Sequence, residues 1–201
     1  MIGGMGPSDD ELVEAFQAGD LSAFDDLVRR WDRKIQGAIY RIMGSEEEAR
    51  DLCQETFLKA YRALRAFKGE ARFSSWLYQI ALNVCRDRMR RKRGRTLVSL
   101  DELDDAGNAP PLDQGPSALE LVEKNDLARA VAGAVAALPD DQREVIVLKE
   151  YQGLTFLEIA EVLGLPTSTV KTRLYRGLVQ LRERLEQQGI RGAAPVPASM
   201  P

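Results

Sequence analysis

The sequence predicts an all-α protein with two small helical domains joined by a flexible acidic linker. Apolar residues recur at the 3.6-residue period of a helix in both halves of the chain, and no segment alternates like a strand. One central stretch lacks this period and is punctuated by glycine, proline and acidic residues. At 201 residues, the chain is long enough for two modest hydrophobic cores.

The first predicted domain spans residues 8–95 and holds four helices. The spacing of apolar residues predicts helices over residues 8–18, 20–42, 46–67 and 76–94, with a loop over residues 68–74. Ser8 and Glu11 form a capping-box sequence at its start, and Asp20 or Ser22 is the expected cap of the second helix. The predicted core face of the third helix consists of Ala49, Leu52, Cys53, Thr56, Phe57, Ala60, Leu64 and Phe67.

The second predicted domain spans residues 119–187, between a linker over residues 96–118 and a disordered tail over residues 188–201. Residues 96–125 contain seven acidic residues and one basic residue, and the tail carries three prolines. The predicted helices cover residues 119–138, 140–151, 155–163 and 167–187. Thr155 and Glu158 form a second capping box, Gly164 marks a turn, and Thr167 or Ser168 is the expected cap of the last helix.

The composition argues against an enzyme. The chain has no histidine, which removes the commonest general base and the commonest metal ligand. It also lacks a phosphate-binding glycine loop and metal-ligand spacings, so we expect no catalytic residue, cofactor or metal. Cys53 and Cys85 lie in apolar helical patterns and are predicted to be buried thiols. No apolar run approaches the length of a membrane span, which favours a cytoplasmic protein.

One helical stripe in the first domain has the composition of a nucleic-acid contact. Residues 8–95 carry 18 basic and 15 acidic residues, although the whole chain has a net charge of −3. At about 100° per residue, the core side of this helix carries Leu77, Ile80, Ala81 and Val84. The opposite side, called the basic stripe below, carries Trp76, Gln79, Asn83, Arg86, Arg90 and Arg93. These side chains suit a nucleic-acid backbone and an unpaired base; a solvated helix end is the alternative.

The predicted loop before the basic stripe presents Arg72 and Phe73. Aromatic residues on a loop beside a basic helix suit the capture of an extruded base. Ordinary packing at the start of the helix is the alternative.

The last two predicted helices have the pattern of a helix-turn-helix. Val170, Leu174 and Leu178 face inward on the second of them. Its outward side, called the recognition face below, carries Thr167, Ser168, Lys171, Thr172, Tyr175 and Arg176. A recognition helix reads duplex DNA with such residues near its N-terminal half, whereas a plain helical hairpin is the alternative.

The third predicted helix has a second face that its core does not use. This acidic–amide face consists of Asp51, Gln54, Glu55 and Leu58, at i, i+3, i+4 and i+7. It fits a solvated helix side and a docking surface for a basic partner helix equally well.

Several motifs, in order along the chain, resemble the bacterial sigma-70 family. Residues 51–57 (DLCQETF), 60–62 (AYR) and 73–83 (FSSWLYQIALN) resemble its region 2. Residues 138–139 (LP), 151–155 (YQGLT), 158–160 (EIA) and 169–173 (TVKTR) resemble its region 4. Because only a linker separates the two, the chain is similar to the extracytoplasmic-function (ECF) subgroup over about residues 8–185.

The resemblance implies an alternative sigma factor that gives core RNA polymerase promoter recognition and strand opening. It implies that the acidic–amide face docks on the clamp helices of the largest polymerase subunit. The basic stripe, with Arg72 and Phe73, would open the −10 element and hold its single strand, and the recognition face would read the −35 duplex. The acidic linker would enter the polymerase channel, and an anti-sigma factor is an expected partner.

Two other classes of protein remain as alternatives. The first is a stand-alone helix-turn-helix regulator whose first domain senses a signal or dimerises. The second is a nucleic-acid-processing enzyme, which the absence of histidine, metal motif and nucleotide loop disfavours.

Overall fold

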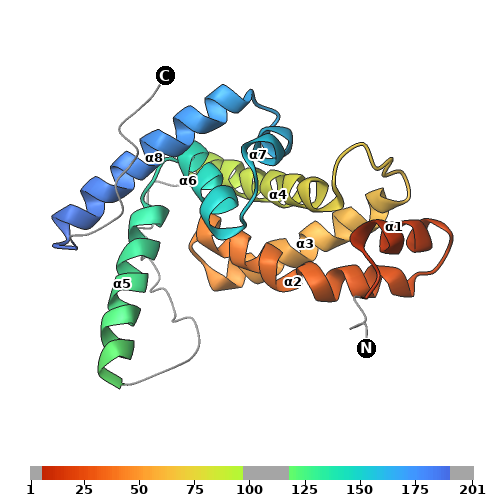
Figure 1. Cartoon of the computed structure of the whole chain (residues 1–201), viewed down its shortest axis with the longest axis horizontal. Helices are drawn as coiled ribbons and strands as arrows, with labels where there is room; N and C mark the ends of the chain where they lie inside the picture. Colours follow the sequence, from red (N-terminus) through yellow and green to blue (C-terminus); the bar gives the residue numbers. More distant parts are fainter. Residues whose placement is uncertain (1–5, 97–117, 191–201) are drawn as a thin grey trace, which may run out of the picture.

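The computed structural model describes residues 6–96 and 118–190, with the backbone alone for residues 95, 96 and 118–126. Regular structure in these ranges is helical throughout, which confirms the predicted all-α class (Figure 1). The first half contains α1 (Asp9–Gln17), α2 (Ser22–Met43), α3 (Glu46–Leu64) and α4 (Phe73–Thr96). The second half contains α5 (Ala118–Ala136), α6 (Asp140–Ile146), the π-helical η1 (Val147–Tyr151), α7 (Phe156–Leu163) and α8 (Thr167–Gln187).

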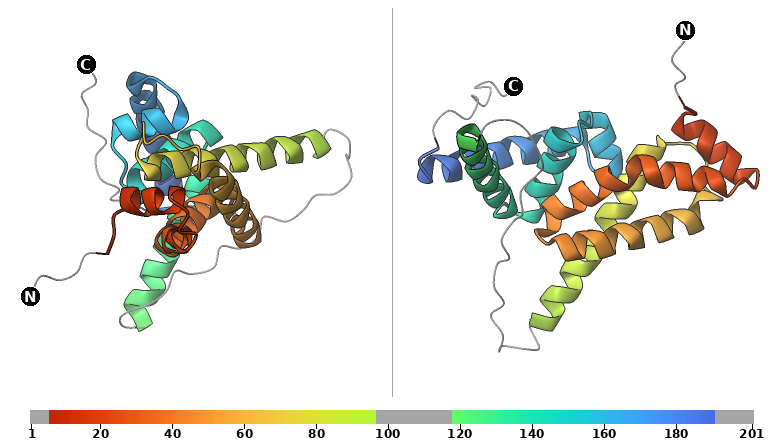
Figure 2. Two further views of the ribbon diagram at one scale, coloured as in Figure 1. Left: turned by 90° about the vertical axis from the view of Figure 1, so that its right-hand side faces the viewer. Right: turned by 90° about the horizontal axis from the view of Figure 1, so that it is seen from below.

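The core of the first half lies between α2, α3 and α4, which pack against one another. On α2, the fully buried Leu27, Ile35 and Ile39 recur at helical spacing and form one apolar side. They meet the predicted core face of α3, where Leu52 and Leu64 are also fully buried. The C-terminal end of α4 projects beyond the other helices (Figure 2).

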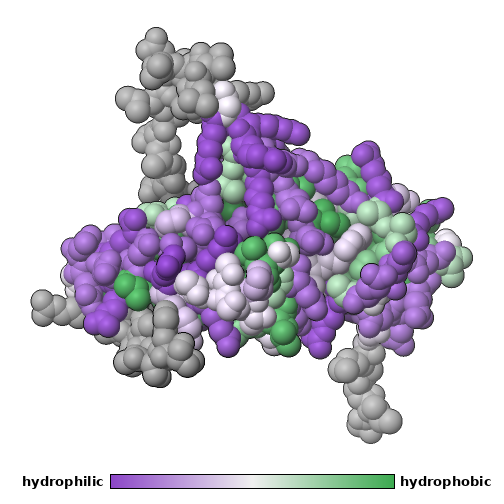
Figure 3. All heavy atoms as spheres, turned by 90° about the horizontal axis from the view of Figure 1, so that it is seen from above, coloured by the Kyte–Doolittle hydropathy of each residue, from purple (hydrophilic) through white to green (hydrophobic). Residues whose placement is uncertain are grey.

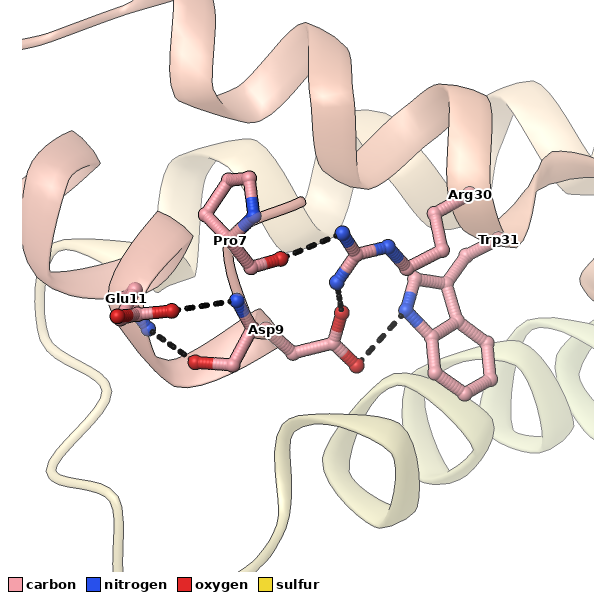
Figure 4. Close-up of polar contacts among 6 residues, drawn as sticks. Pro7, Asp9, Glu11, Arg30 and Trp31 are labelled. Carbon is pink, nitrogen blue, oxygen red and sulfur yellow. Dashed lines mark hydrogen bonds and ion pairs between the residues drawn. The ribbon is translucent and has the colours of Figure 1, made fainter. Parts of the chain in front are cut away.

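The N-terminal helix α1 is fixed to α2 by a small polar cluster (Figure 4). The predicted capping box is present, because the Glu11 amide donates to Ser8 Oγ at 3.2 Å and the Ser8 amide donates to Glu11 Oε2 at 2.6 Å. The carboxylate of Asp9 accepts from Arg30 at 2.5 Å and from the indole nitrogen of Trp31 at 3.1 Å. This contact orients Trp31, whose ring packs edge-on against Phe73 and Tyr78 of α4.

Two glycines shape the second half. Gly164 has φ +65° and ends α7 in the left-handed conformation, so the predicted turn is confirmed. Gly177 of α8 lies against α6, and a Cβ there would come within 2.8 Å of Ile146 Cδ1. The absence of a side chain at Gly177 therefore sets the close packing of α6 and α8.

The two halves are in direct contact. The α4 helix packs against α7, and α2 packs against α5, α6 and η1. The buried apolar side chains of both halves form one continuous cluster. The predicted linker and tail lie mostly outside the described residues, at residues 97–117 and 191–201.

Several predicted helix ends differ from the structure. The α4 helix begins at Phe73 and ends at Thr96, so it is longer at both ends than predicted. The N-cap of α8 is Pro166 without a side-chain hydrogen bond, so the cap predicted at Thr167 or Ser168 is wrong. Asp20 does accept from Ser22 at 3.0 Å, but neither residue occupies the N-cap position of α2. The α3 helix ends at Leu64, three residues before its predicted end, and the remaining ends lie within the one or two residues by which helix bounds usually differ.

Candidate nucleic-acid and polymerase interfaces

The basic stripe lies on α4 opposite its buried side, as the sequence predicts. Leu77, Ala81 and Val84 are buried and Ile80 is half-buried, whereas Gln79 and Asn83 are exposed. Trp76 is half-buried, with its ring centroid 4.9 Å from that of Phe67. The stripe therefore presents the exposed amides of Gln79 and Asn83 beside an indole that packs against Phe67.

Phe73 does not lie on an exposed loop. It is the first residue of α4 and is 2% exposed, with its ring packed against Trp31, Phe67 and Trp76. The interpretation of Phe73 as a base-capturing loop residue is therefore wrong, and the packing alternative holds. Phe73 lies three residues before Trp76, so the helical period brings both rings into one aromatic cluster.

Arg72 and two arginines of the basic stripe form ion pairs with carboxylates from the second half of the chain. Arg86 donates two hydrogen bonds to the Glu144 carboxylate, from Nε at 2.9 Å and from Nη2 at 2.6 Å. Arg72 pairs with Glu158 at 2.8 Å, and Arg93 pairs with Asp140. The hydrogen bond to Glu144 raises the pKa of Arg86 above its ordinary value, against the opposing effect of burial.

Three further basic residues of α4, Arg88, Arg90 and Lys92, have contacts within the first half. Arg90 pairs with Asp87 one turn earlier on the same helix. Arg88 and Lys92 both reach Glu48 of α3, at 3.3 and 2.7 Å. The run of basic residues is therefore anchored on one side to α3, while the stripe faces the second half.

The helix-turn-helix consists of α7 and α8. Thr155 caps α7, and its hydroxyl and amide form a complete capping box with Glu158. These hydrogen bonds from Thr155, with a smaller effect of Arg72, lower the pKa of the Glu158 carboxyl. Leu165 lies half-buried in the turn, and its amide donates to the Ala160 carbonyl at 3.0 Å.

The recognition face of α8 is outward, as predicted. Ser168, Lys171 and Arg176 are exposed, whereas Thr167, Thr172 and Tyr175 are partly exposed. Opposite them, Val170 and Leu174 are buried and Leu178 is half-buried. The space-filling view from above is mostly hydrophilic, with small separate apolar patches (Figure 3). A helix with a buried rear and a polar, cationic front can enter a major groove.

The acidic–amide face lies exposed along α3. Asp51 and Gln54 are exposed, Leu58 is 51% exposed, and Glu55 is partly exposed and pairs with Lys59 at 2.9 Å. A groove beside this face runs between α2 and α3 and is lined partly by Val28, Phe57 and Tyr61 together with Gln54 and Leu58. Polar residues that border an apolar groove suit a protein partner.

Comparison with known families identifies both halves. Residues 27–95 match the family model of Sigma-70 region 2, and residues 128–181 match that of Sigma-70, region 4. The sequence is 35% identical over 185 residues to the RNA polymerase sigma-H factor of Pseudomonas aeruginosa, covering 89% of this chain and 94% of the relative. It is 35% identical over 176 residues to the ECF RNA polymerase sigma factor SigW of Bacillus subtilis, covering 86% and 94%.

The chain belongs to the ECF group of sigma-70 RNA polymerase sigma factors. A solved structure of CnrH in complex with the cytosolic domain of CnrY is also similar, at 29% identity and a TM-score of 0.65, and covers 90% of this chain and 99% of CnrH. The stripe on α4 and the acidic–amide face on α3 lie within region 2. The helix-turn-helix lies within region 4.

Sequence reasoning missed the residues that join regions 2 and 4. The ion pairs of Arg72, Arg86 and Arg93 are three of these contacts. In addition, Tyr78 Oη donates to Gln152 Oε1 at 2.7 Å, and Arg143 donates to the Ile42 carbonyl at 2.7 Å. The Arg41 guanidinium lies 4.3 Å from the Tyr151 ring centroid. The one sequence feature that could have indicated these contacts is Glu144, a carboxylate that directly precedes the apolar run 145–148.

Both cysteines of region 2 are buried free thiols, as predicted. Burial raises the pKa of the Cys53 and Cys85 thiols to about 12. Nearby carboxylates act in the same direction, chiefly Asp32 on Cys53 and Glu144 on Cys85. Within residues 6–96 and 118–190, no helix is both long and apolar enough to cross a membrane.

Proposed function

We propose that this chain directs core RNA polymerase to promoters through two separate DNA-contact surfaces. Region 4 binds the −35 element as a duplex through the recognition face of α8, and region 2 binds and opens the −10 element through the basic stripe of α4. The observation that carries this proposal is the presence of both surfaces in one ECF sigma chain. One is a cationic helix front, and the other combines exposed amides, an indole and guanidiniums.

The division of labour follows from the chemistry of each surface. The exposed Lys171 and Arg176 can contact phosphates and base edges of an intact duplex, which presents its code in the major groove. The exposed Gln79 and Asn83 can hydrogen-bond the Watson–Crick edge of a base only after that base has left the stack. The chain itself supplies binding energy for strand opening and no catalytic residue or cofactor, because polymerase performs the chemistry.

The acidic–amide face of α3 is the proposed contact with core polymerase. Its exposed carboxylate and amide suit a basic helix of the largest subunit, and the exposed Leu58 beside the α2–α3 groove adds an apolar anchor. This face lies on a different helix from the basic stripe. Polymerase and −10 DNA can therefore bind region 2 at the same time.

A protein partner of the anti-sigma class is also proposed. Support comes from the similar CnrH, which was solved in complex with the cytosolic domain of CnrY. Because promoters and RNA polymerase are in the bacterial cytoplasm, the chain is proposed to act there. The predicted channel role of the acidic linker stays a prediction, since residues 97–117 lie outside the described residues.

Reconstituted transcription tests this function. Purified chain is mixed with core RNA polymerase and a library of randomised promoter-length duplexes, and the templates of specific transcripts are sequenced. We expect enriched templates to share two short elements at a fixed spacing, because two surfaces of one chain read them. Binding of specific duplexes by the chain without polymerase, and no stimulation of polymerase, would instead indicate a stand-alone regulator.

A further inference from the structure

The last residue of α1 reaches the end of α3 and the loop that follows it. The side-chain nitrogen of Gln17, Nε2, donates to the Leu64 carbonyl at 3.0 Å and to the Phe67 carbonyl at 2.8 Å. These two carbonyls lie 47 and 50 residues further along the chain. Figure 1 shows α1 beside the end of α3, where the loop to α4 begins. Gln17 therefore joins the N-terminal helix to the segment that leads into α4.

The amide of Gln17 suits this position because its nitrogen carries two donors. Leu64 is the last residue of α3, where carbonyls have no partner within the helix. The Leu64 carbonyl accepts from the Phe67 amide at 3.1 Å as well as from Gln17, so both of its lone pairs are used. The backbone of Phe67 is thus held at its amide and at its carbonyl. Gln17 therefore fixes the turn over residues 64–67.

Phe67 connects this turn to the basic stripe. Its ring packs against the Trp76 indole, with the two centroids 4.9 Å apart, and its centroid lies 6.5 Å from that of Phe73. The ring of Phe73 also contacts Trp76, at a centroid distance of 5.8 Å. Aromatic pairs at these distances attract one another beyond the effect of buried area. A change in the position of Phe67 therefore changes the support of the Trp76 indole.

The position of α1 itself is fixed at its start and along its buried side. Phe16 is 1% exposed and packs into the core of the first half. The Asp9 carboxylate accepts from the indole nitrogen of Trp31 (Figure 4), and Trp31 packs edge-on against Phe73. Both ends of α1 therefore contact residues that support Trp76.

We propose that Gln17 is a positioning residue for promoter opening. Its amide fixes the backbone of Phe67, and the ring of Phe67 fixes the Trp76 indole at the surface that receives the −10 single strand. This inference rests on the proposed role of the basic stripe, since an indole stacks on an unpaired base only from a defined position. The α1 helix lies before residues 27–95, which match the region 2 model, and it thereby takes part in the opening step.

Replacement of Gln17 by methionine tests this inference in the full chain. Methionine is similar to glutamine in length and helix propensity and is also uncharged, but it has no donor for the two carbonyls. Gln187→Met, at the exposed end of α8, is the matched control. Gln17 is itself exposed, so the melting temperature of Gln17→Met should stay close to that of the wild-type chain.

Tryptophan fluorescence reports on the indole without polymerase or DNA. The chain has two tryptophans, Trp31 and Trp76, and both rings contact Phe73. Quenching by acrylamide should be stronger in Gln17→Met than in the wild-type chain and in Gln187→Met, because an indole with less support is more accessible. Equal quenching in all three chains would show that Gln17 does not position Trp76 and would overturn the inference.

Promoter opening by holoenzyme measures the functional consequence. Opening of a promoter selected from the transcription library is followed by the permanganate reactivity of unpaired thymines. Gln17→Met should open this promoter about fivefold more slowly than the wild-type chain, because two hydrogen bonds that fix the turn are lost. Closed complexes should form normally, and Gln187→Met should open the promoter at the wild-type rate. An unchanged opening rate in Gln17→Met would contradict the proposed positioning role.

A double-mutant cycle separates positioning from general destabilisation. If Gln17 acts through Trp76, the variant Gln17→Met with Trp76→Ala should open the promoter no more slowly than Trp76→Ala alone. Defects that add would show that Gln17 acts by another route and would overturn the inference. If Gln17→Met has a much lower melting temperature than the wild-type chain, Gln17→Asn repeats all three measurements, because its side chain is one carbon shorter and draws the amide away from the carbonyls.

The single variant Trp76→Ala distinguishes failure of this inference from failure of the proposed function. Slow opening by Trp76→Ala together with normal opening by Gln17→Met would contradict the positioning role alone. Normal opening by Trp76→Ala would contradict the proposed role of Trp76 in opening, and the role of Gln17 in opening would fail with it.

Discussion

The indole of Trp76 in α4 packs against the ring of Phe67, with the two centroids 4.9 Å apart, and the same helix exposes Asn83. Trp76 therefore contributes to the aromatic cluster of region 2 as well as to the basic stripe. Trp76→Ala should lower the free energy of unfolding by about 1–3 kcal/mol, whereas Asn83→Ala should change it by less than about 0.5 kcal/mol. Urea titration of both variants checks this. An equal loss in both would contradict the different burial of the two side chains.

The acidic–amide face is predicted to carry core binding. Asp51→Ala with Gln54→Ala should weaken the affinity for core RNA polymerase by at least about tenfold, because exposed polar anchors are removed from the proposed interface. The melting temperature should stay nearly constant, since both side chains are exposed. Competition against a labelled sigma factor measures the affinity. Glu14→Ala on α1 is the control, and a double variant with wild-type affinity would exclude this face as the contact.

Both thiols are predicted to be unreactive in the folded chain. With a pKa of about 12 instead of the ordinary value near 9, Cys53 and Cys85 carry about a thousandfold less thiolate near neutral pH. A disulfide reagent should therefore label both rapidly in urea and very slowly in the native chain.

The raised pKa of the two thiols also determines how the stability of the folded chain depends on pH. Because folding favours the protonated thiols, their contribution to stability is complete below the unfolded pKa and is lost as pH rises through the folded pKa, between about 9 and 12.

The variant Cys53→Ala with Cys85→Ala should retain promoter-dependent transcription at a small cost in stability. Rapid labelling of native chain, or lost transcription at full stability, would indicate a redox role.

The recognition face is predicted to contact the −35 duplex through Arg176. If Arg176 contacts a phosphate, Arg176→Ala should reduce the salt slope of closed-complex formation by about one unit; if it contacts a guanine edge, about 1–3 kcal/mol of discrimination should be lost. The control is Arg182→Ala, which removes an exposed arginine that pairs with Glu186 further along α8. Equal effects of the two variants would leave no specific role for Arg176.

Helix positions and buried faces could be predicted because they follow from local spacing. The α3 core, the capping box of Thr155 and Glu158, and the turn at Gly164 each depend on residues within a few positions of one another. The exposed faces of α3 and α8 follow from the same periodicity.

Phe73 and Glu144 show what local spacing does not determine. Phe73 lies at a helix start, where an apolar ring can face solvent or pack inward. The choice depends on Phe67, across the preceding loop, and on Trp31, which is distant in sequence. Glu144 is buried because Arg86 compensates its charge from 58 residues away. The cap expected at Thr167 or Ser168 is wrong because α8 already begins at Thr167, so the preceding Pro166, with φ −60° and ψ 143°, occupies the N-cap position.

Duplex reading and strand opening are proposed to occur on different surfaces of this chain. The most direct test measures transcription by holoenzyme containing Asn83→Ala or Arg176→Ala on a selected promoter, as intact duplex and with a pre-melted bubble at the −10 element. We expect the bubble to rescue Asn83→Ala in part, because it removes the need for melting. Arg176→Ala should keep its defect on both templates, because −35 duplex binding is unchanged by the bubble. Loss of the same step in both variants, without rescue by the bubble, would contradict this separation of surfaces.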